Sequence, residues 1–263
     1  MREKCKLVVM LALAMTLCSL LSHAVAAEWG GIAADAEASG IERGRAETVV
    51  EKLSAAGLTP EQASALFERP LALAKRGVPI HLTLSKMEEG LLKRVPYTTL
   101  KIAVETRTSA IERAYEILAG EGYDSSTEEG RALLDSSALA LESGMERRSL
   151  EAAAEAGRGK SYTQLKTSVE AGETLLLSGI EQETVDAFIA DCLNRNLNRL
   201  EVLRVVRFAQ QKRREGLSGE SLRHALWMGG GAGASGGVHR NSGGAGQGES
   251  TKRRGHAPGG FNR

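Results

Sequence analysis

The chain has 263 residues, of which 42% are hydrophobic and 25% charged, and its 34 basic and 33 acidic residues almost cancel. The total charge therefore indicates no partner, but its distribution is uneven. Three basic residues and one acidic residue lie in 1–26, and five basic and one acidic lie in 229–263, which leaves 26 basic and 31 acidic residues between them. Of three cysteines only Cys192 lies beyond residue 26, so a chain processed there can form no intramolecular disulfide.

The N-terminus has the pattern of a secretory signal peptide. Arg2, Lys4 and Lys6 precede an apolar stretch over 7–21, and Ala24-Val25-Ala26 supplies the small residues that signal peptidase requires. The apolar stretch is short for a membrane span, although an uncleaved anchor stays an alternative. We expect residues 1–26 to be removed and the protein to be periplasmic or extracellular, with no transmembrane segment after cleavage.

The processed chain is predicted to be all-α. Residues 27–39 are small and weakly patterned, which indicates a flexible lead-in. Residues 40–228 are rich in Ala, Leu, Glu, Arg and Lys, and no stretch alternates with a period of two. Thr59-Pro60-Glu61-Gln62 has the order of an N-cap, a first-turn proline and a capping-box glutamine.

Further capping boxes are predicted at Ser126 and Ser161, and glycines that follow helical runs are candidates for left-handed helix ends, among them Gly57, Gly120 and Gly157. The resulting helices are predicted over 41–55, 60–76 with a break or kink at Pro70, 79–93, 96–119, 126–156, 161–177, 181–195, 198–215 and 218–228.

The helical region shows signs of an internal duplication. Residues 57–104 align without a gap on 179–226, with matching apolar positions and matching breaks at Gly57 and Gly179. Helix starts also recur every 17 to 20 residues near the N-terminus of this region. Either a multi-helix bundle of two related halves or a short irregular helical array fits this rhythm.

One segment resembles uncharacterised exported bacterial helical proteins. Gly77-Val78-Pro79 is similar to a helix start in those proteins, and Glu89-Gly90-Leu91-Leu92-Lys93-Arg94-Val95-Pro96 to a link between helices. The resemblance covers residues 76–105, and Ile80-His81 replaces the acidic residue usual after that proline. It implies an exported helical repeat protein and assigns no activity.

Cys192 and the C-terminal segment have simple interpretations. Val185, Phe188, Ile189 and Cys192 follow helical spacing, so the thiol is expected on a buried apolar face. Residues 229–263 contain mainly Gly, Ala, Ser and charged side chains, which predicts a disordered basic tail.

A search for catalytic and metal-binding patterns identifies no site. His81, His224, His239 and His256 have no metal-ligand spacing, and no nucleophile elbow or phosphate loop occurs. Gly219-Glu220-Ser221 resembles the local sequence around a helix-borne acid of peptidoglycan-cleaving enzymes, but Glu220 also suits a helix N-terminus as a plain dipole-complementing acid.

We therefore predict no catalytic, cofactor-binding or metal site, and no cofactor. The expected function is that of a non-enzymatic binding or scaffolding module of the cell envelope, with an envelope hydrolase or lyase as the alternative. The expected partners are an envelope protein or an anionic envelope polymer bound through the basic tail, and not nucleic acid.

Overall fold

The computed structural model describes residues 27–228, and this part of the chain forms eleven helices and no β-strand. The all-α prediction is confirmed. The predicted signal peptide (1–26) and tail (229–263) lie outside the described residues. The first helix covers residues 27–38. The others are α2 (Arg43–Ala55), α3 (Pro60–Lys75), α4 (His81–Leu92), α5 (Tyr97–Gly120), α6 (Glu128–Glu142), α7 (Arg147–Ala156), α8 (Tyr162–Leu177), α9 (Gln182–Asn194), α10 (Arg199–Arg214) and α11 (Gly219–Met228).

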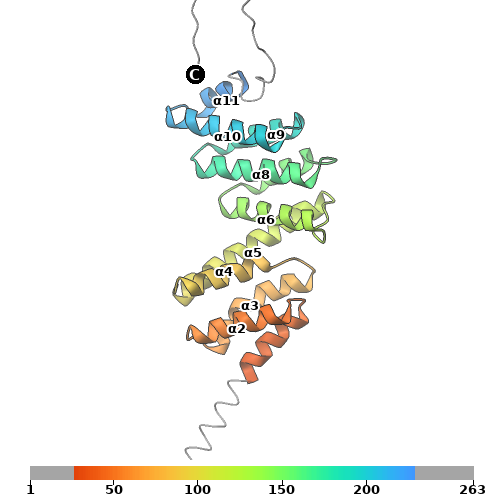
Figure 1. The fold of residues 1–263 in the computed structure, drawn as a ribbon, viewed down its shortest axis with the longest axis vertical. Coiled ribbons are helices and arrows are strands. Elements are labelled where there is room, and N and C mark those ends of the chain that lie inside the picture. Colours follow the sequence, from red (N-terminus) through yellow and green to blue (C-terminus); the bar gives the residue numbers. More distant parts are fainter. Residues whose placement is uncertain (1–26, 229–263) are drawn as a thin grey trace, which may run out of the picture. The chain divides into compact units, whose positions relative to one another are not determined.

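Helices α2 to α11 form two rows of a helical array rather than a bundle. The first row contains α2, α4, α6, α8 and α10, and the second contains α3, α5, α7, α9 and α11. Among the described helices, those that pack closely are neighbours in sequence or are separated by one intervening helix. Figure 1 shows them stacked in chain order. This is the arrangement of repeat proteins, in which each unit buries its apolar face only against its neighbours.

The first row is interrupted between α4 and α6. Helix α5 is 24 residues long and packs against both of these helices, so it carries the array across the interruption. A direct polar contact also crosses it, because His81 Nε2 lies 2.8 Å from Asp135 Oδ2.

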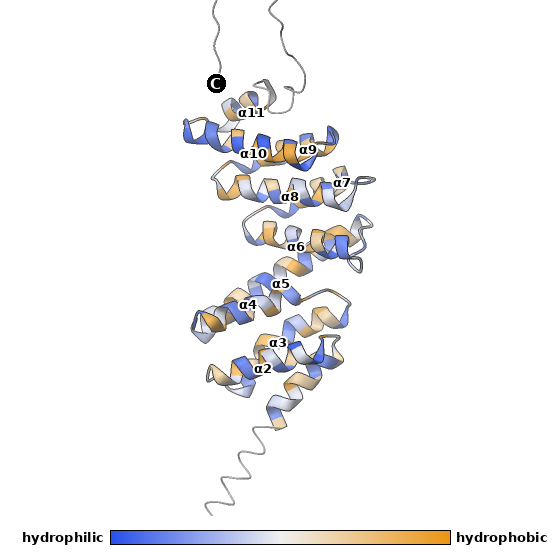
Figure 2. Cartoon of the chain, viewed as in Figure 1, coloured by the Kyte–Doolittle hydropathy of each residue, from blue (hydrophilic) through white to orange (hydrophobic). Residues whose placement is uncertain are grey.

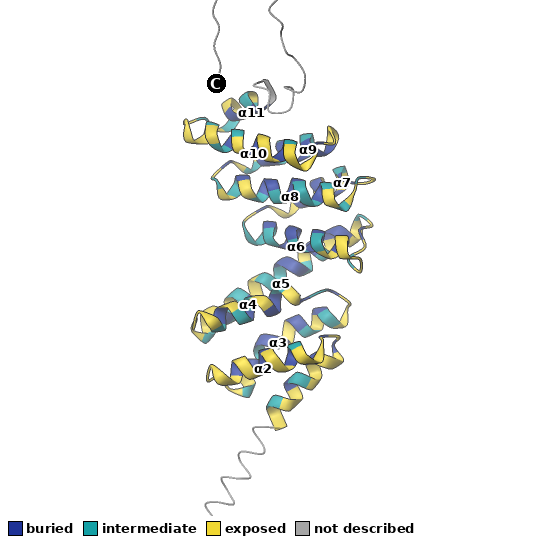
Figure 3. Cartoon of the chain, viewed as in Figure 1, coloured by how far each residue is buried: buried dark blue, intermediate teal, exposed yellow. Residues whose placement is uncertain are grey.

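The core lies between the two rows. Each helix contributes apolar side chains to one buried cluster. Figures 2 and 3 show that apolar and buried positions alternate with polar and exposed ones along each helix. Phe67 and Phe188 are the largest of these buried side chains. Small hydroxyl residues such as Thr108 and Ser168 are also buried and return a hydrogen bond to the carbonyl four residues earlier. At these two positions neighbouring helices approach without leaving the hydroxyl unpaired.

Nine of the described helices end in the same Schellman turn. A residue with positive φ is followed by an apolar residue whose N–H donates to the carbonyl five positions earlier, as from Leu58 to Leu53. The apolar residue packs back onto the core. The nine positive-φ residues are Gly40, Gly57, Gly77, Arg94, Gly122, Gly144, Gly179, Asn196 and Gly216.

Several expectations need correction. Residues 27–38 are helical rather than a flexible lead-in, because Ile32 and Ala36 bury against the core. The single helix predicted over 126–156 is divided by a turn at Gly144, whose φ is 104°. Helix α3 runs through Pro70, so the break expected as one alternative there does not occur.

The ends of three helices also differ from the prediction. The N-cap of α6 is Thr127 and not Ser126, since the Thr127 hydroxyl accepts from Gly130 N. Gly120 lies within α5, and the left-handed residue after it is Gly122. Gly157 caps α7 with right-handed geometry.

Helix boundaries in the two predicted halves correspond closely. Helices α3 and α9 begin 122 residues apart, at Pro60 and Gln182, and α5 and α11 begin 122 apart, at Tyr97 and Gly219. Helices α4 and α10 end at the same offset, but α10 starts four residues earlier than its counterpart. A common origin of the two halves stays a prediction.

Candidate functional site

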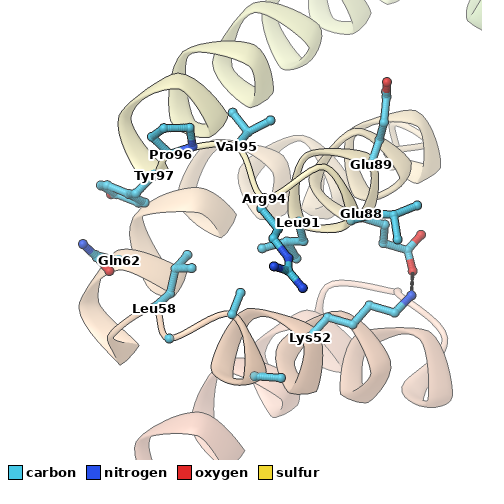
Figure 4. Close-up of a pocket in the computed structure, with 14 residues that line it drawn as sticks. Lys52, Leu58, Gln62, Glu88, Glu89, Leu91, Arg94, Val95, Pro96 and Tyr97 are labelled. Atoms are coloured by element: carbon cyan, nitrogen blue, oxygen red, sulfur yellow. Dashed lines mark hydrogen bonds and ion pairs between the residues drawn. The ribbon is translucent and has the colours of Figure 1, made fainter.

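The candidate site is a hollow between two helix turns in the N-terminal part of the array. It lies where the α2–α3 turn faces the end of α4 and the α4–α5 turn, and its volume is about 1040 Å³. Figure 4 shows these two turns on opposite sides of the opening. The segment from Glu89 to Pro96, which the sequence singled out by resemblance, forms most of one wall.

Much of the lining is apolar. Leu92 is 85% exposed, the most exposed large hydrophobic residue described. Leu58, Leu91, Val95 and Tyr97 are half-buried around the opening. Their backbones are held by the two Schellman turns, because Leu58 N donates to Leu53 O and Val95 N to Gly90 O. The hydrogen bonds of the two turns therefore hold the backbone that carries these apolar side chains in place.

Two acidic residues line the hollow, and both are paired. Glu88 Oε1 lies 2.8 Å from Lys52 Nζ, and Glu88 Oε2 lies 3.0 Å from the Arg45 guanidinium. Glu89 pairs with Lys93, whose hydrogen bond is the main cause that lowers the pKa of Glu89. Figure 4 shows the Glu89 side chain directed away from the opening.

Arg94 is the unpaired charge of the site. Its guanidinium makes no hydrogen bond or ion pair with any residue in 27–228, and the side chain is exposed. In Figure 4 it extends from the α4–α5 turn toward α2, beside Leu91. A cation with no protein partner thus lines a hollow that is largely apolar.

The backbone at Arg94 is also unusual. Its φ is 53°, in the left-handed region that costs a residue with a side chain about 1–2 kcal/mol. The equivalent position is glycine in seven of the other eight Schellman turns of the described chain and asparagine in the eighth, Asn196. The turn at the hollow therefore carries a long cationic side chain where its relatives carry none or a short one.

The wall beside Glu88 is built by an interaction that occurs twice. Arg45 contacts Ser85 and Glu88, and Lys52 contacts Glu88. Arg69, Arg76, Ser109 and Glu112 repeat this pattern between α3 and α5, and every position is shifted by 24 residues. The repetition shows that α2 packs against α4 through the same polar contacts by which α3 packs against α5.

The structure disperses the polar residues that the sequence raised as candidates. His81 pairs with Asp135, and His224 is exposed on α11. Glu220 is exposed in the first turn of α11, far along the chain from the hollow. In residues 27–228 no three His, Cys, Asp or Glu side chains are grouped closely enough to hold a metal ion. His239 and His256 lie outside the described residues.

Cys192 is buried, as its helical spacing predicted. Burial, with a smaller effect of Asp191, raises the pKa of the thiol to about 12. The described residues also contain no helix with the length and apolar character needed to cross a membrane.

Sequence reasoning missed Arg94. A signal was available, because Arg94-Val95 stands where seven of the other eight breaks read glycine followed by an apolar or aromatic residue. That departure identifies a strained position. It does not reveal the hollow beside Arg94, because the hollow forms only when α2 packs against α4.

No protein-family model, curated protein or solved structure matches this chain. The class of the protein follows from its own fold, which is a two-row array of α-helices.

Proposed function

We propose that this chain is an exported, non-enzymatic binding module of the cell envelope, and that its hollow holds an apolar segment of a partner that carries a carboxylate. The observation that supports this most strongly is Arg94, a strained and unpaired cation in a hollow whose lining is largely apolar. Residues kept in strained conformations concentrate where a ligand is bound.

The ligand class follows from the chemistry of the lining. A guanidinium presents its N–H donors in a planar fork that matches a carboxylate. Leu58, Leu91 and Leu92 offer the apolar area that would bury flanking side chains of the same ligand. The two acids of the hollow are paired, Glu88 with Lys52 and Arg45 and Glu89 with Lys93. Paired carboxylates repel an anionic ligand less than unpaired ones would.

A hydrolase has no comparable support. Glu220, the one candidate acid, is exposed and lines neither the hollow at Arg94 nor the smaller one beside Arg147. A general acid needs an apolar or enclosed setting to hold its proton at neutral pH.

The binding proposal is tested with a defined probe. The probe is acetyl-Ala-Leu-Leu with a free C-terminal carboxylate, and its control is the same peptide with a C-terminal amide. We expect backbone amide shifts at residues 57–62 and 91–97 with the acid, and affinity at least fivefold weaker with the amide. The variant Arg94→Ala removes the difference, whereas Arg113→Ala, another exposed and unpaired arginine of the described chain, preserves it. Equal binding of acid and amide would overturn the proposal.

Export is tested separately. Intact-mass measurement of the protein recovered from the periplasm or medium is expected to show a chain that begins at Ala27. A protein recovered at full length from the cytosol would contradict the export part of the proposal and leave the binding part to its own test.

A further inference from the structure

Helix α10 is the most basic helix of the described chain. Between Arg199 and Arg214 it carries six basic residues and one acidic residue, Glu201. Glu201 is engaged in a capping box with Asn198. The buried side of the helix is apolar and consists of Val202, Val205, Val206 and Ala209.

The opposite side of α10 combines arginines with leucines. We call this surface the arginine face, and it consists of Leu200, Leu203, Arg204, Arg207, Gln211 and Arg214. These positions recur every three or four residues, so they share one side of the helix. Leu200 is 68% and Leu203 40% exposed. The face contains no acidic residue.

The three arginines of this face are unpaired, as is Arg199 in the first turn of the helix, whereas the two other cations of α10 are engaged. Lys212 pairs with Glu215 at 2.7 Å, and Arg213 donates to the Gly179 carbonyl at 3.3 Å. Arg204, Arg207 and Arg214 make no hydrogen bond or ion pair with any residue of 27–228. Three exposed guanidiniums on one side of one helix repel one another unless an anion lies between them.

No carboxylate in residues 27–228 pairs with these three arginines. Helix α10 is the last described helix of its row, where only α8 flanks it, and α11 packs against it from the other row. On α8, Glu170 pairs with Lys166 and also accepts from Ser136, and Glu173 accepts from Ser143. Residues 229–263 carry five basic residues and one acidic residue, so their charge is of the wrong sign to be the occupant.

We infer that the arginine face is a docking surface for an acidic helix of a partner protein. Carboxylates at helical spacing on that partner would pair with Arg204, Arg207 and Arg214, and apolar side chains would cover Leu200 and Leu203. A membrane surface fits less well. The two leucines stand at one end of the face, and the arginines occupy its remainder, so no continuous apolar stripe is available to enter lipid. This inference does not depend on the hollow at Arg94.

The test uses the processed full chain and a synthetic peptide helix of seventeen residues with Glu and Leu repeated at i, i+4 spacing. A second peptide has Gln at every Glu position. We expect the acidic peptide to bind, to bind more weakly as salt is raised, and to bind at least tenfold more tightly than the Gln peptide. The variant Arg204→Glu/Arg207→Glu is expected to reduce the affinity at least tenfold.

The matched control is Arg113→Glu/Arg131→Glu, which makes the same change of net charge at two exposed, unpaired arginines elsewhere on the described chain. It is expected to bind the acidic peptide within about threefold of the unmodified protein, and circular dichroism establishes that both variants are folded. Equal losses in the two variants would show nonspecific attraction and overturn the inference. Binding to vesicles with anionic headgroups but not to the acidic peptide would overturn it in favour of a lipid surface.

Discussion

Arg107 on α5 and Glu142 at the end of α6 form the least exposed ion pair of the described chain, with side chains that are 11% and 21% exposed. Arg107 interrupts the otherwise apolar stripe of α5, and its partner explains why a charge is tolerated there. The pair joins the two helices that carry the array past the interruption between α4 and α6.

Breaking this pair from one side is expected to be costly. The variant Glu142→Ala leaves the largely buried Arg107 charge without a partner, so the free energy of unfolding should fall by about 3 kcal/mol. The double variant Arg107→Leu/Glu142→Leu leaves no unpaired charge and is expected to lose less. Urea denaturation followed by circular dichroism measures both, and a double variant that loses as much stability as Glu142→Ala, or more, would contradict this account.

Glu112 is expected to stabilise the fold in a pH-dependent way. Burial alone would raise the pKa of Glu112, but hydrogen bonds from Arg76 and Arg69 outweigh burial and lower it. A lowered pKa means that the contribution is present above the ordinary pKa of glutamate and is lost as the pH falls below it.

The variant Glu112→Gln should therefore cost about 0.5–1 kcal/mol at pH 7, because the groups are partly exposed, and almost nothing at pH 3. Denaturant titrations at both pH values measure the difference. At pH 7 the loss of stability in Glu112→Gln is compared with the loss in Glu88→Gln, which alters the equivalent pairing with Arg45 and Lys52. A loss for Glu112→Gln that is as large at pH 3 as at pH 7 would rule out the ion-pair explanation.

Arg94 is expected to oppose stability while it supports binding. The left-handed backbone costs a non-glycine residue about 1–2 kcal/mol, and a glycine at this position avoids that cost. Glycine loses more conformational freedom on folding, however, which offsets roughly 0.5–1 kcal/mol of the stability gained. The variant Arg94→Gly should therefore raise the free energy of unfolding by about 0.5–1 kcal/mol and abolish binding of the acidic tripeptide.

Asn196→Gly provides the control for this prediction. Asn196 has the same φ of 53° in the equivalent turn after α9, but it does not line the hollow. The substitution is expected to leave tripeptide binding unchanged. If Arg94→Gly bound the tripeptide as the unmodified protein does, the stored strain at Arg94 would have no functional meaning.

The Cys192 thiol is expected to be unreactive in the folded protein. Because burial raises its pKa to about 12, the fold favours the protonated thiol. This contribution to stability is complete below the unfolded pKa, near 8.5, and is lost as the pH rises toward 12, by up to about 1.4 kcal/mol per pH unit.

Two measurements check this prediction. Native protein should react with Ellman's reagent only at the rate of unfolding, and non-reducing gels should show a monomer. Between pH 8 and pH 10.5 the Cys192→Ala variant should lose less stability than the unmodified protein. Rapid labelling of the native thiol would contradict the burial.

The sequence by itself determined the helical class and most helix ends. These depend on interactions that span a few residues, such as the Thr59 capping box or the hydrogen bond that closes the turn at Gly57, and local composition specifies them. Prediction failed where burial overrode local pattern. Residues 27–38 became a helix because Ile32 and Ala36 reach the core, and the Gly144 turn fell within a continuous helical composition.

Only the tertiary structure decided which helices meet. The partners of Arg107, Arg45 and Arg69 lie 35 to 43 residues away in the sequence, and their pairing depends on each helix packing against others of the array. The same packing brings the Gly57 turn to face the Arg94 turn and leaves the arginine face of α10 uncovered at the end of its row. Both candidate surfaces arise because side chains distant in the sequence become neighbours only when an amphipathic helix finds the helix that covers it.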